Sequence, residues 1–231
     1  MHERWFTDAA ANGPSPIHPP LTAVELITLQ QILDFASNPL NAGKELMHCL
    51  DAAGTVVHDT STGHQAAPQT ELMNKAIEAG KGVRLWHNHP SQDSLSHRDW
   101  LCAGISADLE VLALNARGSM FVGRVKLWDD RLHDLLEWLP RLGGDLKFYM
   151  STLAKDRHLD IDAACELPKF TGHVLNSGLA NCGLVQYGYC LLPQDQKLIH
   201  LFSLLSIVAD GQSFATRAIN QKLGEQEPDS E

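Results

Sequence analysis

The stretch LWHNHPSQDSLSHRD, residues 85–99, gives the strongest indication of fold and chemistry in the chain. It begins as an apolar run, continues as His-Asn-His-Pro and ends on Ser-His-Arg-Asp. In a β-strand, residues i and i+2 point to the same face, so His87 and His89 are expected to project together. Pro90 cannot continue a hydrogen-bonded ladder, and the strand is predicted to end there. The pattern therefore predicts two adjacent imidazoles at the end of a strand.

A helix is predicted to follow this strand and to supply a third ligand. Ser96 is a typical N-cap residue, and Asp99 lies in the first turn after it. Two imidazoles and one carboxylate leave one coordination position open to water, which is the ligand set of a catalytic zinc site. Asp93 is the rival carboxylate, but no helix follows it to hold it in place. We predict one zinc ion per chain, bound by His87, His89 and Asp99.

A catalytic zinc site also needs a group that takes a proton from the bound water. Zinc lowers the pKa of that water to ~7, and a nearby carboxylate can then accept and deliver the proton. Glu45 is predicted on a strand, on the face that it shares with Met47 and Cys49. A carboxylate on an apolar face of a strand needs a functional reason.

The rest of the chain predicts three zones. Residues 1–20 are rich in Pro, Gly and Ala and are expected to form a flexible N-terminal tail. Residues 21–128 alternate helical and strand patterns, which favours an α/β (α+β) fold with a central sheet flanked by helices. The expected elements are a helix at 22–37, two strands within 44–60, a helix at 70–80, a strand at 82–87, a helix at 96–106 and a hairpin within 108–128.

Residues 129–231 predict a mainly helical C-terminal extension with an acidic tail. Helical periodicity over 129–155 is expected to be interrupted at Pro140 and at the pair Gly143 and Gly144. Further helices are expected within 194–211 and 214–224. The extension is expected to enlarge the core and to hold a substrate or a partner protein.

Composition limits the classes of function. With 231 residues, of which 44% are apolar, the chain can form one large domain or a domain plus an extension. A formal net charge of −10 without a run of Lys or Arg argues against a nucleic-acid partner. No apolar run approaches the ~18 residues that a membrane span needs, and the N-terminus lacks a signal-peptide pattern. Five widely spaced cysteines without a C-x-x-C favour a reducing cytoplasm.

Taken together, Glu45, the HNHP of residues 87–90 and the SHRD of residues 96–99 resemble the JAMM motif of the MPN+ (JAB-domain) zinc metalloproteases. The resemblance covers roughly residues 21–128 and includes the order of the elements. It implies the MPN/JAB-like, cytidine-deaminase-like fold, in which a curved central sheet is flanked by helices. The His-Asn-His-Pro-Ser wording is also shared with the RadC-like branch of this fold.

The resemblance implies a role for each motif residue. His87, His89 and Asp99 would bind Zn²⁺, Glu45 would act as general base and then general acid, and Ser96 would donate a hydrogen bond to the oxyanion of the intermediate. Other glutamates, namely Glu25, Glu71 and Glu78, are predicted on helices, where the family does not place its base. Read alone, Ser96 is most simply a helix N-cap. The segment PSQDSL between the second histidine and the serine is one residue shorter than the family spacing.

The family cleaves ubiquitin or ubiquitin-like proteins from conjugates or trims their C-termini. The resemblance therefore implies a deubiquitinase-like zinc isopeptidase or peptidase whose partner is a ubiquitin-like protein. Such a tail would add as a strand to a sheet edge, with residues 52–68 best placed to help. Two alternatives stay open: an inactive MPN-type interaction scaffold, and a RadC-like protein linked to DNA metabolism. Retention of every motif residue argues against the first, and the acidic charge argues against the second.

Overall fold

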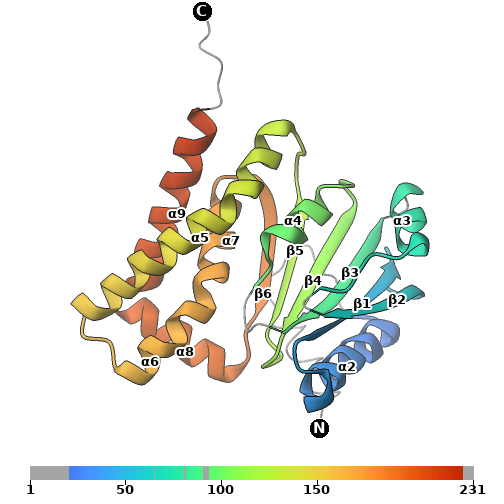
Figure 1. Ribbon diagram of the computed structural model, residues 1–231, viewed down its shortest axis with the longest axis horizontal. Helices are drawn as coiled ribbons and strands as arrows, with labels where there is room; N and C mark the ends of the chain where they lie inside the picture. The colour runs from blue at the N-terminus through green and yellow to red at the C-terminus, as the bar shows by residue number, and fades with distance from the viewer. Residues whose placement is uncertain (1–20, 65, 81, 91–93, 226–231) are drawn as a thin grey trace, which may run out of the picture.

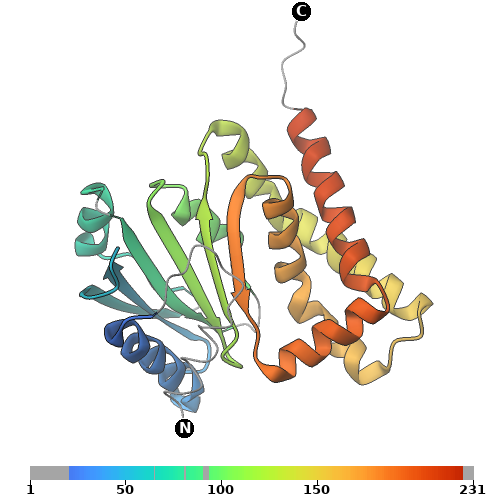
Figure 2. The ribbon, with the colours of Figure 1, turned by 180° about the vertical axis from the view of Figure 1, so that it is seen from behind.

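The computed structural model describes residues 21–64, 66–80, 82–90 and 94–225. Its centre is an open sheet with helices on both faces (Figures 1 and 2). The strands are β1 (Lys44–Asp51), β2 (Val57–His64), β3 (Val83–His89), β4 (Leu109–Asn115), β5 (Met120–Val125) and β6 (Val185–Cys190). They form a six-stranded sheet in the order β2-β1-β3-β4-β5-β6. β3 and β4 pair in parallel, whereas the other neighbouring pairs are antiparallel, so the sheet is mixed.

Helices cover the two faces of this sheet unequally. The described helices are α2 (Ala23–Ser37), η1 (Pro39–Asn41), α3 (Glu71–Glu78), α4 (His97–Ala103), α5 (Asp130–Asp156), α6 (Ile161–Glu166), η2 (Leu167–Phe170), α7 (Thr171–Asn181), α8 (Pro193–Leu204) and α9 (Ile207–Gly224). α2 packs on one face, over a smaller apolar core that includes Trp86 and Leu112. The larger core lies on the other face and combines side chains from α3, α4, α5, α7 and α9.

Local signals in the first half of the chain produce the elements that they predict. α2 begins with a capping box, in which the Thr22 hydroxyl accepts from the Glu25 N–H and the Glu25 carboxylate accepts from the Thr22 N–H at 2.6 Å. The β1–β2 turn contains Gly54 at a φ of +66°, a conformation that glycine adopts without strain. Some observed bounds differ from the predicted ones, since α3 spans Glu71–Glu78, α4 ends at Ala103 and β2 runs on to His64, beyond residue 60. The mixed α/β fold expected for this region is confirmed.

The interruption predicted within residues 129–155 is wrong, because α5 runs unbroken from Asp130 to Asp156 with Pro140 inside it. A proline in a helix removes one backbone hydrogen bond and costs about 3 kcal/mol. Burial of a long apolar stripe along α5 outweighs that cost. The buried residues of this stripe are Leu132, Leu135, Leu136, Leu139, Leu142, Leu146, Met150 and Ala154.

The last part of the chain differs from the prediction in two further ways. The helix expected at 194–211 is broken, because Ser206 has a φ of 53° and separates α8 from α9. β6 was not predicted at all, yet it pairs with β5 from Met120↔Cys190 to Val125↔Val185. Residues beyond 128 therefore extend the same sheet and contribute to the same core as residues 21–128.

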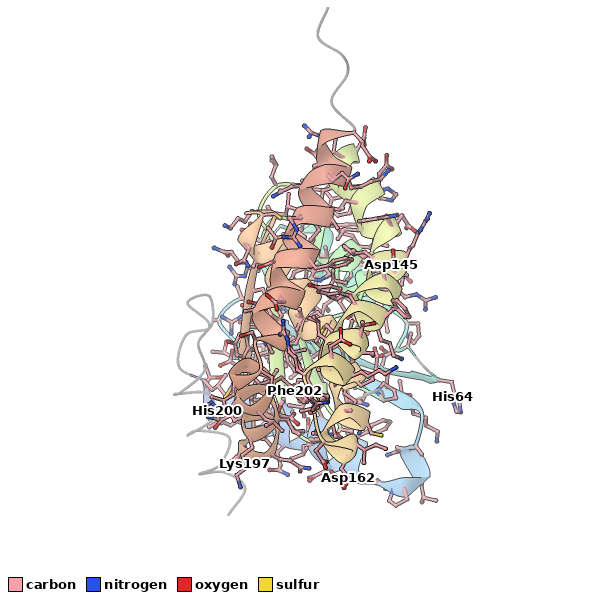
Figure 3. The ribbon with its side chains drawn as sticks, turned by 90° about the vertical axis from the view of Figure 1, so that its left-hand side faces the viewer. His64, Asp145, Asp162, Lys197, His200 and Phe202 are labelled. Carbon is pink, nitrogen blue, oxygen red and sulfur yellow. The ribbon has the colours of Figure 1, made fainter. Side chains whose placement is uncertain are left out.

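The helices after β6 pack by their apolar sides. Figure 3 shows Phe202 of α8 turned into the molecule, whereas Lys197 and His200 of the same helix are exposed. The Phe202 ring meets Phe170 edge-on, with 5.6 Å between ring centroids. Among the described residues, no single helix is long and apolar enough to cross a membrane. α8 and α9 pass that test only as a pair bent by 80°.

Candidate metal centre

The site begins at the end of β3, the strand that lies between β1 and β4. His87 and His89 are 1% and 7% exposed and point to the same face, as the alternation predicts. Asn88 points to the opposite face, where its amide continues the pairing with β1. It accepts from the Leu46 N–H at 2.7 Å and donates to the Lys44 carbonyl at 3.0 Å. Asn88, to which no sequence signal assigned a role, thus holds the strand end that carries both histidines.

Asp99 is held at the start of α4 by Ser96. The two residues form a capping box, in which the Asp99 carboxylate accepts from the Ser96 N–H at 2.6 Å. The Ser96 hydroxyl also donates to Asp99 Oδ2 at 2.7 Å. This hydroxyl therefore orients the aspartate, and its predicted contact with an oxyanion stays a prediction.

The three predicted ligands come together. The Nε2 atoms of His87 and His89 are 2.9 Å apart. Asp99 Oδ1 lies 3.1 Å from the first of these atoms, and Asp99 Oδ2 lies 3.2 Å from the second. All ligand atoms of this group fall within 4.8 Å of one another. Asp93, the rival carboxylate, lies outside the described residues.

This donor set fits a zinc ion. Imidazole nitrogen and carboxylate oxygen are both zinc ligands, and three protein ligands leave a position for water. In the described part of the chain, His87 Nδ1 has no hydrogen-bond partner, so strand geometry and Asp99 orient this ring. Burial would raise the pKa of the Asp99 carboxyl, but the adjacent imidazoles of His87 and His89 hold that pKa well below its usual value. The carboxylate is thus charged and able to bind a cation.

Glu45 of β1 lines the same pocket as these three side chains. It is 6% exposed, and burial raises the pKa of its carboxyl, which the neighbouring His87 and the Ala67 N–H lower in part. Ala67 donates to Glu45 Oε1 at 3.1 Å. A raised pKa brings a carboxylate closer to the range in which a general base works near neutral pH.

These groups line one pocket of about 640 Å³. Its inner wall consists of the strand ends and α4. Its opposite wall comes from the C-terminal part of the chain, chiefly from α5 and α7. The residues on that wall include Leu139, Pro140, Gly143, Gly144, Lys147, Thr171, Gly172, Leu175 and Asn176. Residues 129–231 therefore take part in the site, a contribution that no motif in the sequence indicated.

Comparison of the chain with protein-family models, with characterised proteins and with solved structures gave no significant match. Function must therefore be argued from the geometry and chemistry of the site itself.

Proposed function

We propose that this protein is a zinc-dependent isopeptidase or peptidase of the JAMM/MPN+ type. One observation carries the proposal: two imidazoles, one carboxylate and a buried glutamate converge in a single open pocket. The order of elements up to residue 128 and a central sheet flanked by helices are those that the resemblance implies, so we also propose an MPN/JAB-like fold. The formal net charge of −10 favours a protein substrate over nucleic acid.

Each residue would have a defined task. His87, His89 and Asp99 would hold the metal, which when bound would lower the pKa of a water molecule and polarise a carbonyl group. Glu45 Oε1 already accepts the Ala67 N–H, which leaves Oε2 to take a proton and pass it to the leaving amine. Ser96 would keep Asp99 in place through its two hydrogen bonds and, if its hydroxyl turns, meet the oxyanion.

The substrate class proposed is a ubiquitin-like protein with an extended C-terminal tail. β2 lies at one edge of the sheet and pairs with β1 on its inner side. Ala66 and Ala67, just after β2, line the metal pocket. A tail added to this edge would therefore run toward the pocket, in the manner of β-strand addition.

The test begins with zinc content and cleavage measured on the same preparations. Wild type should hold about one zinc per chain and hydrolyse a ubiquitin-like protein fused to a fluorogenic amine. Glu45→Gln should keep fold and zinc but lose cleavage, since only the base is removed. His87→Ala should lose both. Zinc without cleavage of any ubiquitin-like fusion would favour an interaction scaffold, and a zinc-free wild type after reconstitution would overturn the proposal.

A further inference from the structure

Asn176 is a buried amide that links the C-terminal part of the chain to the metal centre. It lies in α7, is 1% exposed and borders the metal pocket. Its Oδ1 accepts from the Trp100 indole N–H at 2.8 Å. Its Nδ2 donates to the Leu95 carbonyl at 2.8 Å and to the Ser94 hydroxyl at 3.1 Å. One side chain thus holds the chain on both sides of Ser96 and Asp99.

Neighbouring contacts strengthen this link from the same side. The Ser94 hydroxyl also lies 2.7 Å from the Tyr187 hydroxyl of β6. That hydroxyl in turn lies 2.9 Å from Nδ1 of His173, one turn before Asn176 in α7. Ser94, His173 and Asn176 are each no more than 2% exposed. Two elements beyond residue 128 therefore hold the segment that leads into α4.

Trp100 also packs tightly against β5 of the sheet. It is 1% exposed, and its ring lies against Gly123 of β5, where a Cβ atom would come within 2.3 Å of Trp100 Cη2. Trp100 follows Asp99 directly in the chain. The hydrogen bond from its indole to Asn176 therefore fixes the ligand-bearing turn from the C-terminal side.

α4 needs this support because it is short. Seven residues give a helix that is marginal in isolation, since nucleation is costly and few hydrogen bonds repay it. A metal ligand, by contrast, must be placed within a few tenths of an ångström. The position of Asp99 relative to His87 and His89 therefore depends on what anchors α4.

We propose that Asn176 is a positioning residue of the metal centre, which holds the start of α4 so that Asp99 meets His87 and His89. This inference rests on the proposed zinc site. It gives the C-terminal helices a role beyond filling the core, because they set the affinity for the metal. The loss of groups that orient metal ligands typically lowers metal affinity about 10–100-fold.

The test compares zinc affinity in folded variants by competition with a chelator. Asn176→Leu keeps a similar volume but removes all three hydrogen bonds, and we expect zinc affinity to fall about 10–100-fold. Phe202→Leu is the matched control, because it weakens the core at α8 without touching α4 or the pocket. It should lose stability yet keep wild-type zinc affinity.

A second variant protects the test if Asn176→Leu does not fold. Trp100→Phe keeps an aromatic ring but removes the indole N–H that Asn176 accepts, and it should lower zinc affinity in the same direction. The double variant should lose less zinc affinity than the product of the two single losses. Both substitutions remove the same hydrogen bond, from the Trp100 indole N–H to Asn176. Wild-type zinc affinity in either folded single variant would overturn the inference while leaving the proposed function intact. A zinc-free wild type would overturn both.

Discussion

β3 carries a buried charged cluster on each of its faces, and the two clusters differ in their balance of charge. On the α2 side, Arg84 forms ion pairs with Glu25 and, at 3.6 Å, with Glu110. Glu110 also pairs with Arg124 at 3.2 Å. Two carboxylates thus meet two guanidinium groups, and the formal charges cancel within the protein.

On the other face, the metal cluster has no such balance. Glu45 and Asp99 bring two carboxylates beside the imidazoles of His87 and His89, and among the described residues no Lys or Arg forms an ion pair with either carboxylate. This cluster opens into the pocket, whereas Arg84 and its partner glutamates do not line it. The difference shows that buried charge alone does not mark a site. Two carboxylates that share a pocket with two imidazoles, and have no guanidinium or ammonium partner among the described residues, are the stronger sign that a cluster can bind a cation.

Removing Arg84, whose guanidinium pairs with Glu25 and Glu110 on the α2 side of β3, should have the largest effect on stability. Arg84→Met removes the guanidinium that pairs with buried Glu25 and leaves Glu110 with Arg124, and we expect a loss of about 3–5 kcal/mol in the free energy of unfolding. Urea unfolding of the zinc-free protein measures it. Exposed Lys75→Met, which removes a surface ion pair with Glu71, is the control and should change stability by less than about 1 kcal/mol. Equal losses in both variants would contradict the comparison.

Zinc held by His87, His89 and Asp99 should stabilise the protein. Zinc that binds only the folded chain, at a free concentration about 1,000 times its Kd, should add about 4 kcal/mol. His89→Ala should lose this gain, because one ligand is absent. Arg84→Met should keep it, since the ion pairs described for Arg84 involve none of the proposed ligands. Thermal unfolding with and without zinc measures this gain in stability for each protein. A zinc-induced gain in His89→Ala would mean that the metal binds elsewhere.

His173 provides a third buried group, which has neither a carboxylate partner among the described residues nor a place among the predicted ligands. Burial lowers the pKa of its imidazole from 6.5 to about 4. The unfolded chain therefore takes up a proton below pH 6.5 that the folded chain refuses, and stability falls as the pH falls from 6.5 to about 4. One such proton is worth about 3 kcal/mol over that window.

Urea unfolding of the zinc-free protein at several pH values measures this effect. His173→Gln keeps a polar side chain but cannot titrate, so its stability should fall less steeply than that of wild type between pH 6.5 and pH 4. Identical slopes for the two proteins would show that folding does not lower the pKa of His173.

A substitution at Gly144, in the part of the pocket wall that α5 provides, should have the smallest effect on stability. Gly144 lies inside a helix, and a Cβ atom added there meets nothing within 4 Å. Gly144→Ala should therefore raise stability by about 1 kcal/mol, because alanine loses less backbone freedom than glycine. Zinc affinity should stay at the wild-type value, whereas cleavage of a bulky substrate should fall. A loss of stability would mean that this face of α5 is packed.

The convergence of the three proposed ligands could be predicted because each placement depends on local sequence. Alternation along a strand places His87 and His89 on one face, and the Ser96 capping box fixes Asp99 in the first helical turn. Asn176 could not be found in this way, because it lies 77 residues beyond Asp99 and belongs to no motif. Glu25 illustrates the converse, since a buried carboxylate that could have rivalled Glu45 proves to be bound to Arg84 on the other face.

The sequence by itself determined the elements whose signals are short-range: the capped helices, the hairpins and the pair of histidines at a strand end. Tertiary structure decided the rest. It kept α5 continuous through Pro140, because burial of the leucine stripe outweighs one lost hydrogen bond. It also added β6 to the sheet, since an exposed edge of β5 gains a partner there. Both outcomes depend on surfaces that exist only once distant segments have met.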